Sequence, residues 1–301
     1  MSELLTVAPE VEEALRDERA VVALETTIVA HGFPAGEGLA VGIECERRVR
    51  TTGAVPAAVA VLDGTVRVGL TDAELERVAA AGPGASKVGP RDLAACAVRG
   101  EVGAATVGGT LAACRLPGVR VMATGGIGGV HRGFAKVPDV SADVLELGRV
   151  EVLVVCSGAK SLLDVRATVE LLETLGVPVL GFRTDELPLF YAAHGGPQVS
   201  QRVESPEEAA QIAAAHWLLA RGSALVLARA PDPSMEDVEP LIEEALAEAR
   251  REGVGGQVLT PFVLAYLHEH SGGRTLEVNR QLVADNATLA GEVAVAYARR
   301  E

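Results

Sequence analysis

The strongest constraint on the fold is a regular alternation of short apolar, β-branched runs with segments of helical periodicity along most of the 301 residues. Runs of this kind are typical of strands buried on both faces, and helices between them connect parallel strands. The alternation therefore predicts an α/β protein with a mostly parallel central sheet covered by helices on both faces. The predicted strands are 21–28, 57–62, 103–107, 119–124, 151–156, 177–182 and 224–229. The predicted helices are 36–51, 72–81, 90–99, 109–116, 141–148, 161–175 and 206–221.

Two features depart from this alternation. The dipeptide Asp63-Gly64 follows an apolar run and is a hairpin signal, so we expect a small antiparallel excursion there. From residue 236 onward the pattern is almost entirely helical and ends in a helix over 276–299. Because neither an internal repeat nor a low-complexity linker interrupts the sequence, residues 1–301 are predicted to form a single domain.

The charge and the cysteines exclude several classes of function. The net charge is −14, which argues against nucleic-acid binding because phosphate neutralisation needs clustered Lys and Arg. The four cysteines form no CxxC pair, so free buried thiols in a cytoplasmic protein are expected. The polar, acidic N-terminal segment does not resemble a signal peptide, and no apolar run reaches the roughly 18 residues of a membrane span. We therefore expect neither nucleic acid nor a membrane as partner.

Two glycine-containing segments look like nucleotide-binding loops, but neither has the required spacing. In residues 124–133, TGGIGGVHRG, His131 stands where a GxGxxG motif needs its last glycine. In SGAKS, Ala159 separates the glycine from the lysine, and residues 151–156 lack the upstream glycine of a P-loop. These spacings argue against a dinucleotide cofactor and against a kinase or an ATPase.

Polar residues gather where the predicted strands end, which is the edge at which α/β proteins place their ligands. Each has an ordinary structural explanation when taken alone, such as a helix N-cap for Ser141 or a salt-bridged edge residue for Glu25. As a set, however, they follow several different strands, and this favours an active site. The set comprises Glu25, Lys87, His131, Asp139, Ser141, Asp143 and Lys160.

The chemistry of these residue types suggests roles. A lysine that is partly removed from water beside another cation becomes a nucleophile toward carbonyl carbon, which suits Lys160. A carboxyl held among apolar residues can act as a general acid, which suits Glu25. Asp139 offers a hard oxygen ligand to a divalent cation such as Mn²⁺ or Mg²⁺. Lys87, the TGG turn and the helix start at Ser141 form a potential phosphate cradle. The residues thus favour a lysine-dependent enzyme acting on a phosphorylated carbonyl compound, with sugars among the candidates.

Seven motifs, in order along almost the whole chain, resemble those of the pseudouridine-5′-phosphate glycosidase family, which includes indigoidine synthase A-like proteins. The motifs are ALETTIVAHGFP (23–34), SKVGPRDL (86–93), ATVGGTL (105–111), MATGGIGGVHRG (122–133), DVSADVLEL (139–147), VVCSGAKSLLD (154–164) and NRQLVADNATLAGEVA (279–294). The resemblance implies reversible cleavage of pseudouridine 5′-phosphate to uracil and ribose 5-phosphate by a homotrimeric α/β/α enzyme with one Mn²⁺ per chain.

The resemblance also implies roles for individual residues. Carried over by motif, Lys160 is the nucleophile, Glu25 is the proton donor, and Asp139 binds the metal through ordered waters. The substrate-binding residues that the resemblance implies are Lys87, Val107, Thr124, His131, Ser141, Ala142, Asp143 and Asn286.

A lysine suits this reaction because the sugar is attached to carbon C5 of uracil, and a carbanion is a poor leaving group. Once Glu25 has opened the ribose ring, Lys160 is expected to bond to C1′, and the C–C bond breaks to leave an iminium. The carboxylate nucleophile of ordinary retaining glycosidases cannot form an iminium. Two alternatives stay open at this point. One is a class I aldolase-like enzyme acting on another sugar phosphate, and the other is a non-catalytic sugar-phosphate sensor.

Overall fold

The computed structural model describes residues 4–34, 36–219 and 222–300, and in this part of the chain the strands form two sheets. The larger sheet contains Leu5–Val7 (β1), Val21–Leu24 (β2), Val55–Leu62 (β3), Thr65–Val68 (β4), Ser86–Val88 (β5), Gly103–Ala105 (β6), Val121–Ala123 (β7), Leu153–Cys156 (β9), Val179–Phe182 (β11), Gln201–Val203 (β12) and Leu225–Arg229 (β13). Its order is β1-β4-β3-β2-β7-β9-β13-β11-β12, with β6 paired to β3 and β5 paired to β6. The smaller sheet pairs Val130–His131 (β8) with Leu163–Asp164 (β10).

The central part of the larger sheet is parallel, as the sequence predicted. From β3 through β2, β7, β9, β13 and β11 to β12, every neighbouring pair runs in the same direction. All residues of β2, β3, β7 and β9 are buried, which is the pattern of strands covered on both faces. Because aromatic residues are scarce, valine, alanine and leucine fill most of this core.

An antiparallel excursion occurs where the hairpin signal predicted it. Asp63 and Gly64 both have positive φ angles, 51° and 78°, as a two-residue turn of the primed type requires, and they reverse β3 into β4. The excursion is larger than expected, because β6 also runs antiparallel to β3 and carries β5 on its outer edge. Strand β5 was not predicted, and it matters because it carries Lys87.

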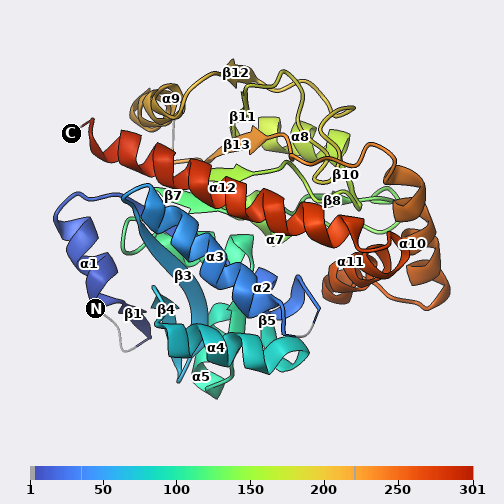
Figure 1. Cartoon of the computed structure of the whole chain (residues 1–301), viewed down its shortest axis with the longest axis horizontal. Coiled ribbons are helices and arrows are strands. Elements are labelled where there is room, and N and C mark those ends of the chain that lie inside the picture. The colour runs from blue at the N-terminus through green and yellow to red at the C-terminus, as the bar shows by residue number, and fades with distance from the viewer. Residues whose placement is uncertain (1–3, 35, 220–221, 301) are drawn as a thin grey trace.

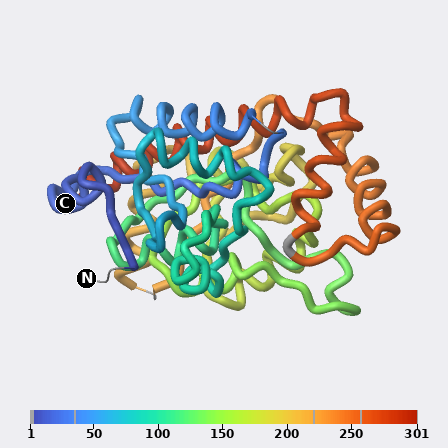
Figure 2. Tube along the Cα trace, turned by 90° about the horizontal axis from the view of Figure 1, so that it is seen from below, coloured from blue at the N-terminus to red at the C-terminus, as the bar shows by residue number. Residues whose placement is uncertain are grey.

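The helices form layers on the two faces of the sheet. Their bounds are Pro9–Arg16 (α1), Thr27–His31 (α2), Gly38–Thr51 (α3), Asp72–Ala81 (α4), Leu93–Arg99 (α5), Val107–Cys114 (α6), Ala142–Leu147 (α7), Val165–Thr174 (α8), Pro206–Leu219 (α9), Glu239–Arg251 (α10), Leu259–His270 (α11) and Arg274–Ala298 (α12), with short 3₁₀ turns at Gly82–Gly84 (η1) and Gly256–Val258 (η2). In Figure 1, α3 and α12 cross the near face side by side, whereas α7 and α8 lie behind the sheet. Figure 2 shows α10 and α11, in orange, at the end of the molecule opposite α1.

The prediction of one strand over 21–28 is wrong beyond Leu24, and the reason bears on the site. The Thr26 hydroxyl donates to the carbonyl of Val59 at 2.6 Å and accepts from the amide of Ala105 at 3.0 Å. These bonds replace sheet pairing and allow the chain to turn into α2 immediately. Glu25 therefore lies just past the strand end and not within the strand.

Most predicted helices are confirmed, and α4 has the predicted bounds of 72–81. The end of the helix predicted over 206–221 lies outside the described residues, since α9 is described to Leu219. All four cysteines are free and buried, as expected. No helix within the three described ranges is long and apolar enough to cross a bilayer.

Candidate active site

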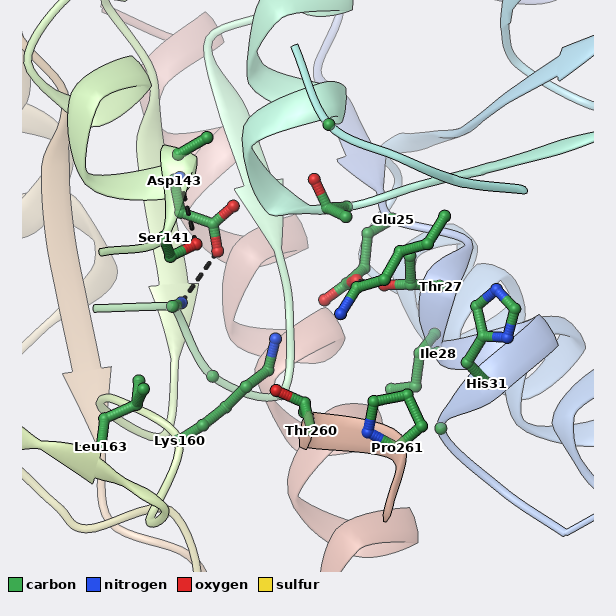
Figure 3. A pocket seen from close by; sticks show the side chains of 18 of the residues that line it. Glu25, Thr27, Ile28, His31, Ser141, Asp143, Lys160, Leu163, Thr260 and Pro261 are labelled. Carbon is green, nitrogen blue, oxygen red and sulfur yellow. Dashed lines mark hydrogen bonds between the residues drawn. The ribbon is translucent and has the colours of Figure 1, made fainter. Parts of the chain in front are cut away.

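A cavity of about 270 Å³ opens beyond the carboxyl ends of β2, β7 and β9, where a parallel sheet is expected to place a ligand. It brings together Glu25 and Lys160, which are 135 positions apart in the sequence. Figure 3 shows Lys160 reaching in from below, with Ser141 and Asp143 on one side and Glu25 and Thr27 on the other. The predicted site residues that line the cavity are Glu25, Lys87, His131, Ser141, Ala142, Asp143 and Lys160.

Glu25 is 7% exposed, and both oxygens of its carboxylate are held by hydroxyl groups. Thr27 Oγ1 donates to Oε2, and Thr124 Oγ1 donates to Oε1. These bonds fix the direction of the carboxylate, and a proton on Glu25 requires one threonine to turn its hydroxyl hydrogen away. Thr27 was not predicted as a site residue, although it stands two residues after Glu25 in the same motif.

Lys160 stands in a tight turn between β9 and β10. Its amide donates to the carbonyl of Ile127 at 3.0 Å, and this bond connects the turn to the glycine-rich loop, residues 125–140, beside it. The turn begins at Gly158, whose φ is +87°, and a Cβ there would lie 1.8 Å from the carbonyl oxygen of Pro188. Only glycine fits such a position. The small residues before Lys160 thus bring a lysine from a buried strand to the wall of the cavity.

Lys87 reaches the same cavity from β5. Burial, and to a smaller degree the positive charge of Lys160, lowers the pKa of Lys87 to about 8. Asp143 and Glu25 oppose this shift. Lys87 is therefore still mostly protonated at neutral pH, but it loses its charge at lower pH than an exposed lysine does. Two amines that share one cavity with a carboxylate are suited to an anionic ligand that reacts with an amine.

Asp143 organises the wall of the cavity more than it faces a ligand. Its Oδ1 accepts from the amide of Gly108, and its Oδ2 accepts from the amide of Gly128, both at 2.8 Å. The side chain is 4% exposed and joins the start of α6 to the glycine-rich segment. A Cβ at Gly128 would lie 2.3 Å from Oγ of Ser141, so the close approach requires glycine. Ser141 also caps α7 by accepting from the amide of Asp143 at 3.2 Å.

Three residues predicted to bind substrate lie behind the wall. Among the described residues, those lining the cavity do not include Val107, Thr124 or Asn286. Val107 is completely buried at the start of α6, and the hydroxyl of Thr124 donates a hydrogen bond to Glu25. The amide nitrogen of Asn286 donates to the carbonyl of Thr124 at 2.9 Å and to Oγ of Ser157 at 3.1 Å. The side chains of Thr124 and Asn286 thus have partners within the protein and support the wall, and the contact of these three residues with substrate stays a prediction.

Asn279, one of the cavity-lining residues, was missed by the sequence reasoning. It lies seven residues before Asn286 on α12 and is 2% exposed. Its Oδ1 has no hydrogen-bond partner within the described ranges, which is unusual for a buried amide oxygen. The signal was available, because Asn279 opens the last of the seven motifs. The prediction instead named Asn286, a second asparagine in the same motif.

The wall opposite Ser141 is mostly apolar and comes from α2 and α11. Ile28 and His31 belong to α2, whereas Thr260, Pro261 and Leu264 belong to α11 (Figure 3). An apolar slot with few polar groups suits a flat heterocycle better than a sugar. Sequence patterns do not indicate this wall directly, because at least 228 positions separate α11 from α2.

His131 lines the cavity, whereas Asp139, which lies beside His131, is not among the described residues that line it. The amide of His131 donates to the carbonyl of Asp139 at 3.0 Å, and the negative charge of Asp139 opposes the effect of burial, which lowers the pKa of His131. Nδ1 of His131 is buried and has no hydrogen-bond partner in the described part of the chain.

The metal ion that the resemblance implies has few protein ligands available in the described part of the chain. Across the described residues, no group of three or more His, Cys, Asp or Glu side chains is arranged to hold a metal ion. These residues therefore do not form a metal site made wholly of protein ligands. A single carboxylate such as that of Asp139 fits a cation that keeps several waters and takes further oxygens from substrate phosphate.

Comparison with known protein families gives a consistent result. The family model described as indigoidine synthase A like protein matches residues 10–296. A pseudouridine-5′-phosphate glycosidase of Herpetosiphon aurantiacus is 46% identical over 298 residues, which cover 97% of each chain. The pseudouridine-5′-phosphate glycosidase of Escherichia coli is 43% identical over 302 residues, covering 99% of this chain and 96% of the relative.

Two solved structures share the fold over nearly their whole length. The prealnumycin C-glycosynthase AlnA, solved in complex with ribulose 5-phosphate, superposes with a TM-score of 0.90 at 36% identity and covers 100% of this chain and 99% of its own. An indigoidine synthase A-like protein from Thermotoga maritima superposes with a TM-score of 0.88 at 35% identity, covering 98% of this chain and 97% of its own.

Proposed function

This chain belongs to the indigoidine synthase A-like family, and on this premise we propose that it is an enzyme that reversibly cleaves the C-glycosidic bond of pseudouridine 5′-phosphate. The products are uracil and ribose 5-phosphate. The observation that carries the proposal is the meeting of Lys160, Lys87 and the doubly held carboxyl of Glu25 in one cavity beside an apolar slot.

The two sides of the cavity suit the two ends of this substrate. Lys87 retains most of its charge at neutral pH, and together with the hydroxyl of Ser141 it supplies donors to a phosphate. The slot formed by Ile28 and Pro261 suits the flat uracil ring. The unpaired Oδ1 of Asn279 is an acceptor for an N–H group of the base. The ribose then lies between these two ends, beside Lys160.

Glu25 and Lys160 supply the proton and the nucleophile. The carboxyl of Glu25 gives its proton to the ring oxygen of ribose as the bond from that oxygen to C1′ breaks. The neutral amine of Lys160 bonds to C1′, and the proton that it then loses returns to the carboxylate of Glu25, which supplies the proton for C5 in the next step. C5 of uracil takes up a proton as the C1′–C5 bond breaks, and the nitrogen lone pair forms an iminium with C1′. Water adds to the iminium, releases ribose 5-phosphate and regenerates the amine.

Incubation of the purified protein with uracil and ribose 5-phosphate tests this function directly. We expect formation of pseudouridine 5′-phosphate, detected by chromatography and mass spectrometry, because the reaction is reversible. A class I aldolase acting on another sugar phosphate would not consume uracil, and a sensor would bind ribose 5-phosphate without turnover. The absence of a C-glycoside product in either direction would contradict the proposal.

The metal is proposed to be Mn²⁺, with Asp139 as its protein ligand, and it would stabilise negative charge on the substrate when bound. We expect Asp139→Asn to remove the stimulation by Mn²⁺ and to reduce turnover at least about tenfold, since the amide is a weaker ligand than the carboxylate. The measurement is turnover against added Mn²⁺ after dialysis with a chelator. Asp185→Asn is the control, because it changes another loop carboxylate, which is ion-paired with Arg202 at 3.0 Å. Full wild-type activity after exhaustive chelation would contradict the assignment.

The assembly is proposed to be a homotrimer, and exposed apolar side chains such as Val98, Phe134 and Val137 are consistent with further burial in an assembly. Each chain has a mass of 31.1 kDa, so light scattering is expected to give about three times that value. A monomer at micromolar concentration would show the proposal to be wrong. A cytoplasmic location is proposed as well, and the four free thiols support it.

A further inference from the structure

Arg132 lies in the glycine-rich loop and has no role in the proposed reaction. Its side chain nevertheless makes hydrogen bonds to two other parts of the protein. It follows His131 directly, and its side chain is 28% exposed. On one side its guanidinium contacts the turn that carries Lys160. Nη2 donates to the carbonyl of Ser161 at 2.8 Å, and Nε donates to the carbonyl of Leu163 at 3.3 Å.

On its other side, the same guanidinium contacts helix α10. Nη1 donates to Oε1 of Glu239 at 2.7 Å and also to Glu243. These two glutamates are four residues apart and therefore lie on one face of the helix. Helix α10 leads through η2 into α11, which supplies Thr260 and Pro261 to the cavity wall. One side chain thus joins the turn that carries Lys160 to α10, the helix that precedes and packs against the slot-forming α11.

Backbone hydrogen bonds hold the turn at Lys160, and Arg132 adds bonds to two carbonyls that follow. The amide of Lys160 is fixed by the carbonyl of Ile127, and the amide of Leu163 closes the turn onto the carbonyl of Lys160, each at 3.0 Å. After the turn, β10 is two residues long and, among the described strands, pairs with β8 alone. The carbonyls of Ser161 and Leu163 point toward Arg132, and a planar guanidinium can bond both of them and the acidic pair together.

We propose that Arg132 is a positioning residue that fixes the turn from which Lys160 reaches the substrate and holds that turn against α10. The inference rests on the proposed function, because positioning matters only if Lys160 is the nucleophile. Lys160 must meet a single carbon atom, whereas the phosphate and the base are bound by other residues. Loss of Arg132 therefore affects the step in which the amine bonds to C1′ and leaves substrate binding largely intact.

The experiment compares Arg132→Met, Arg132→Lys and Arg166→Met with the wild-type enzyme. Arg166 is exposed on α8 and borders the same outer surface as Arg132, so its replacement removes a nearby charge without touching the lysine turn. We measure kcat and KM for pseudouridine 5′-phosphate and the thermal unfolding midpoint. We also measure the rate at which borohydride traps ribose 5-phosphate on Lys160 at saturating sugar phosphate.

For Arg132→Met we expect kcat and the trapping rate to fall together by about tenfold to a hundredfold, the cost of a misplacement of about 1 Å. KM is expected to stay within about threefold of the wild-type value, since the binding groups are unchanged. Arg132→Lys should lie between the wild type and Arg132→Met, because an ammonium keeps the charge but not the planar fork. Arg166→Met should behave like the wild type. If Arg132→Met does not fold, Arg132→Lys carries the test.

An unchanged kcat in both Arg132 variants, or a rise in KM with kcat and the trapping rate unchanged, would overturn the inference. A loss of equal size in Arg166→Met would do the same, because it would indicate a general charge effect. Failure of the proposed function is distinguishable, since the wild-type enzyme itself would then show no turnover of pseudouridine 5′-phosphate.

Discussion

Lys160→Ala is expected to reduce turnover of pseudouridine 5′-phosphate at least about a thousandfold, because the covalent route through C1′ is lost with the amine. The same variant should lose covalent labelling. Ribose 5-phosphate in its open form is an aldehyde, and the neutral amine of Lys160 condenses with it to an imine. Borohydride reduces that imine to a stable secondary amine. In the wild-type enzyme, peptide mass spectrometry should therefore find one reduced sugar phosphate per chain, attached within residues 157–164.

Lys87 and Lys136 are the internal controls for this experiment. Lys87 lines the same cavity and is proposed to bind phosphate as a cation, and the negative charge of a bound phosphate favours the protonated amine. Lys87→Ala should therefore mainly weaken substrate binding and leave the labelling of Lys160 detectable. Lys136 lies on the exposed part of the glycine-rich loop and should stay unmodified. Labelling of Lys87 with Lys160 untouched would reverse the two assignments.

Glu25→Gln is expected to lower turnover at least about a hundredfold while leaving substrate binding intact, because glutamine keeps the shape of the side chain but cannot supply a proton. The pocket should tolerate the change. The amide oxygen can still accept from one of the two threonines, and the hydroxyl of the other can turn to accept from the new NH₂ group. The measurement is kcat together with substrate affinity by calorimetry.

Glu46→Gln is a matched control for the removal of a buried carboxyl. Burial raises the pKa of Glu46 to about 7, so this group is partly protonated near neutral pH. It lies on α3 and, with Glu25, borders a small separate space of about 20 Å³ behind the active-site cavity. Glu46→Gln should retain most of the activity. Near-normal turnover in Glu25→Gln, or an equal loss in Glu46→Gln, would reduce Glu25 to a structural residue.

Much of the site could be predicted because its residues follow strand ends. Lys160 stands just past β9, and Glu25 stands just past β2. In a parallel sheet these ends meet at one edge, so residues that are distant in sequence arrive in one cavity. The error in the length of the strand at 21–28 did not disturb this result, because the Thr26 hydroxyl turns the chain without moving Glu25 away from that edge.

The two asparagines of α12 show where prediction from sequence stops. Asn279 and Asn286 are seven residues apart, so they lie on nearly the same face of the helix. They are also separated by about 10 Å along the helix axis. Which of them reaches the cavity depends on how far α12 extends across the sheet, and packing against α3, α9 and the strands sets that position. The sequence pattern does not specify the position of α12 across the sheet.

What the sequence by itself determined was local and periodic. Apolar runs placed the parallel strands, Asp63-Gly64 placed the hairpin, and the seven motifs indicated the family, because these properties depend on neighbours along the chain. The tertiary structure alone decided how groups are shared between distant segments. Asp143 is occupied by two backbone amides, Thr124 holds Glu25, and Arg132 joins the lysine turn to α10. A hydrogen-bonding group satisfies its partners across space, so its role becomes fixed only when the packed chain brings those partners within about 3 Å.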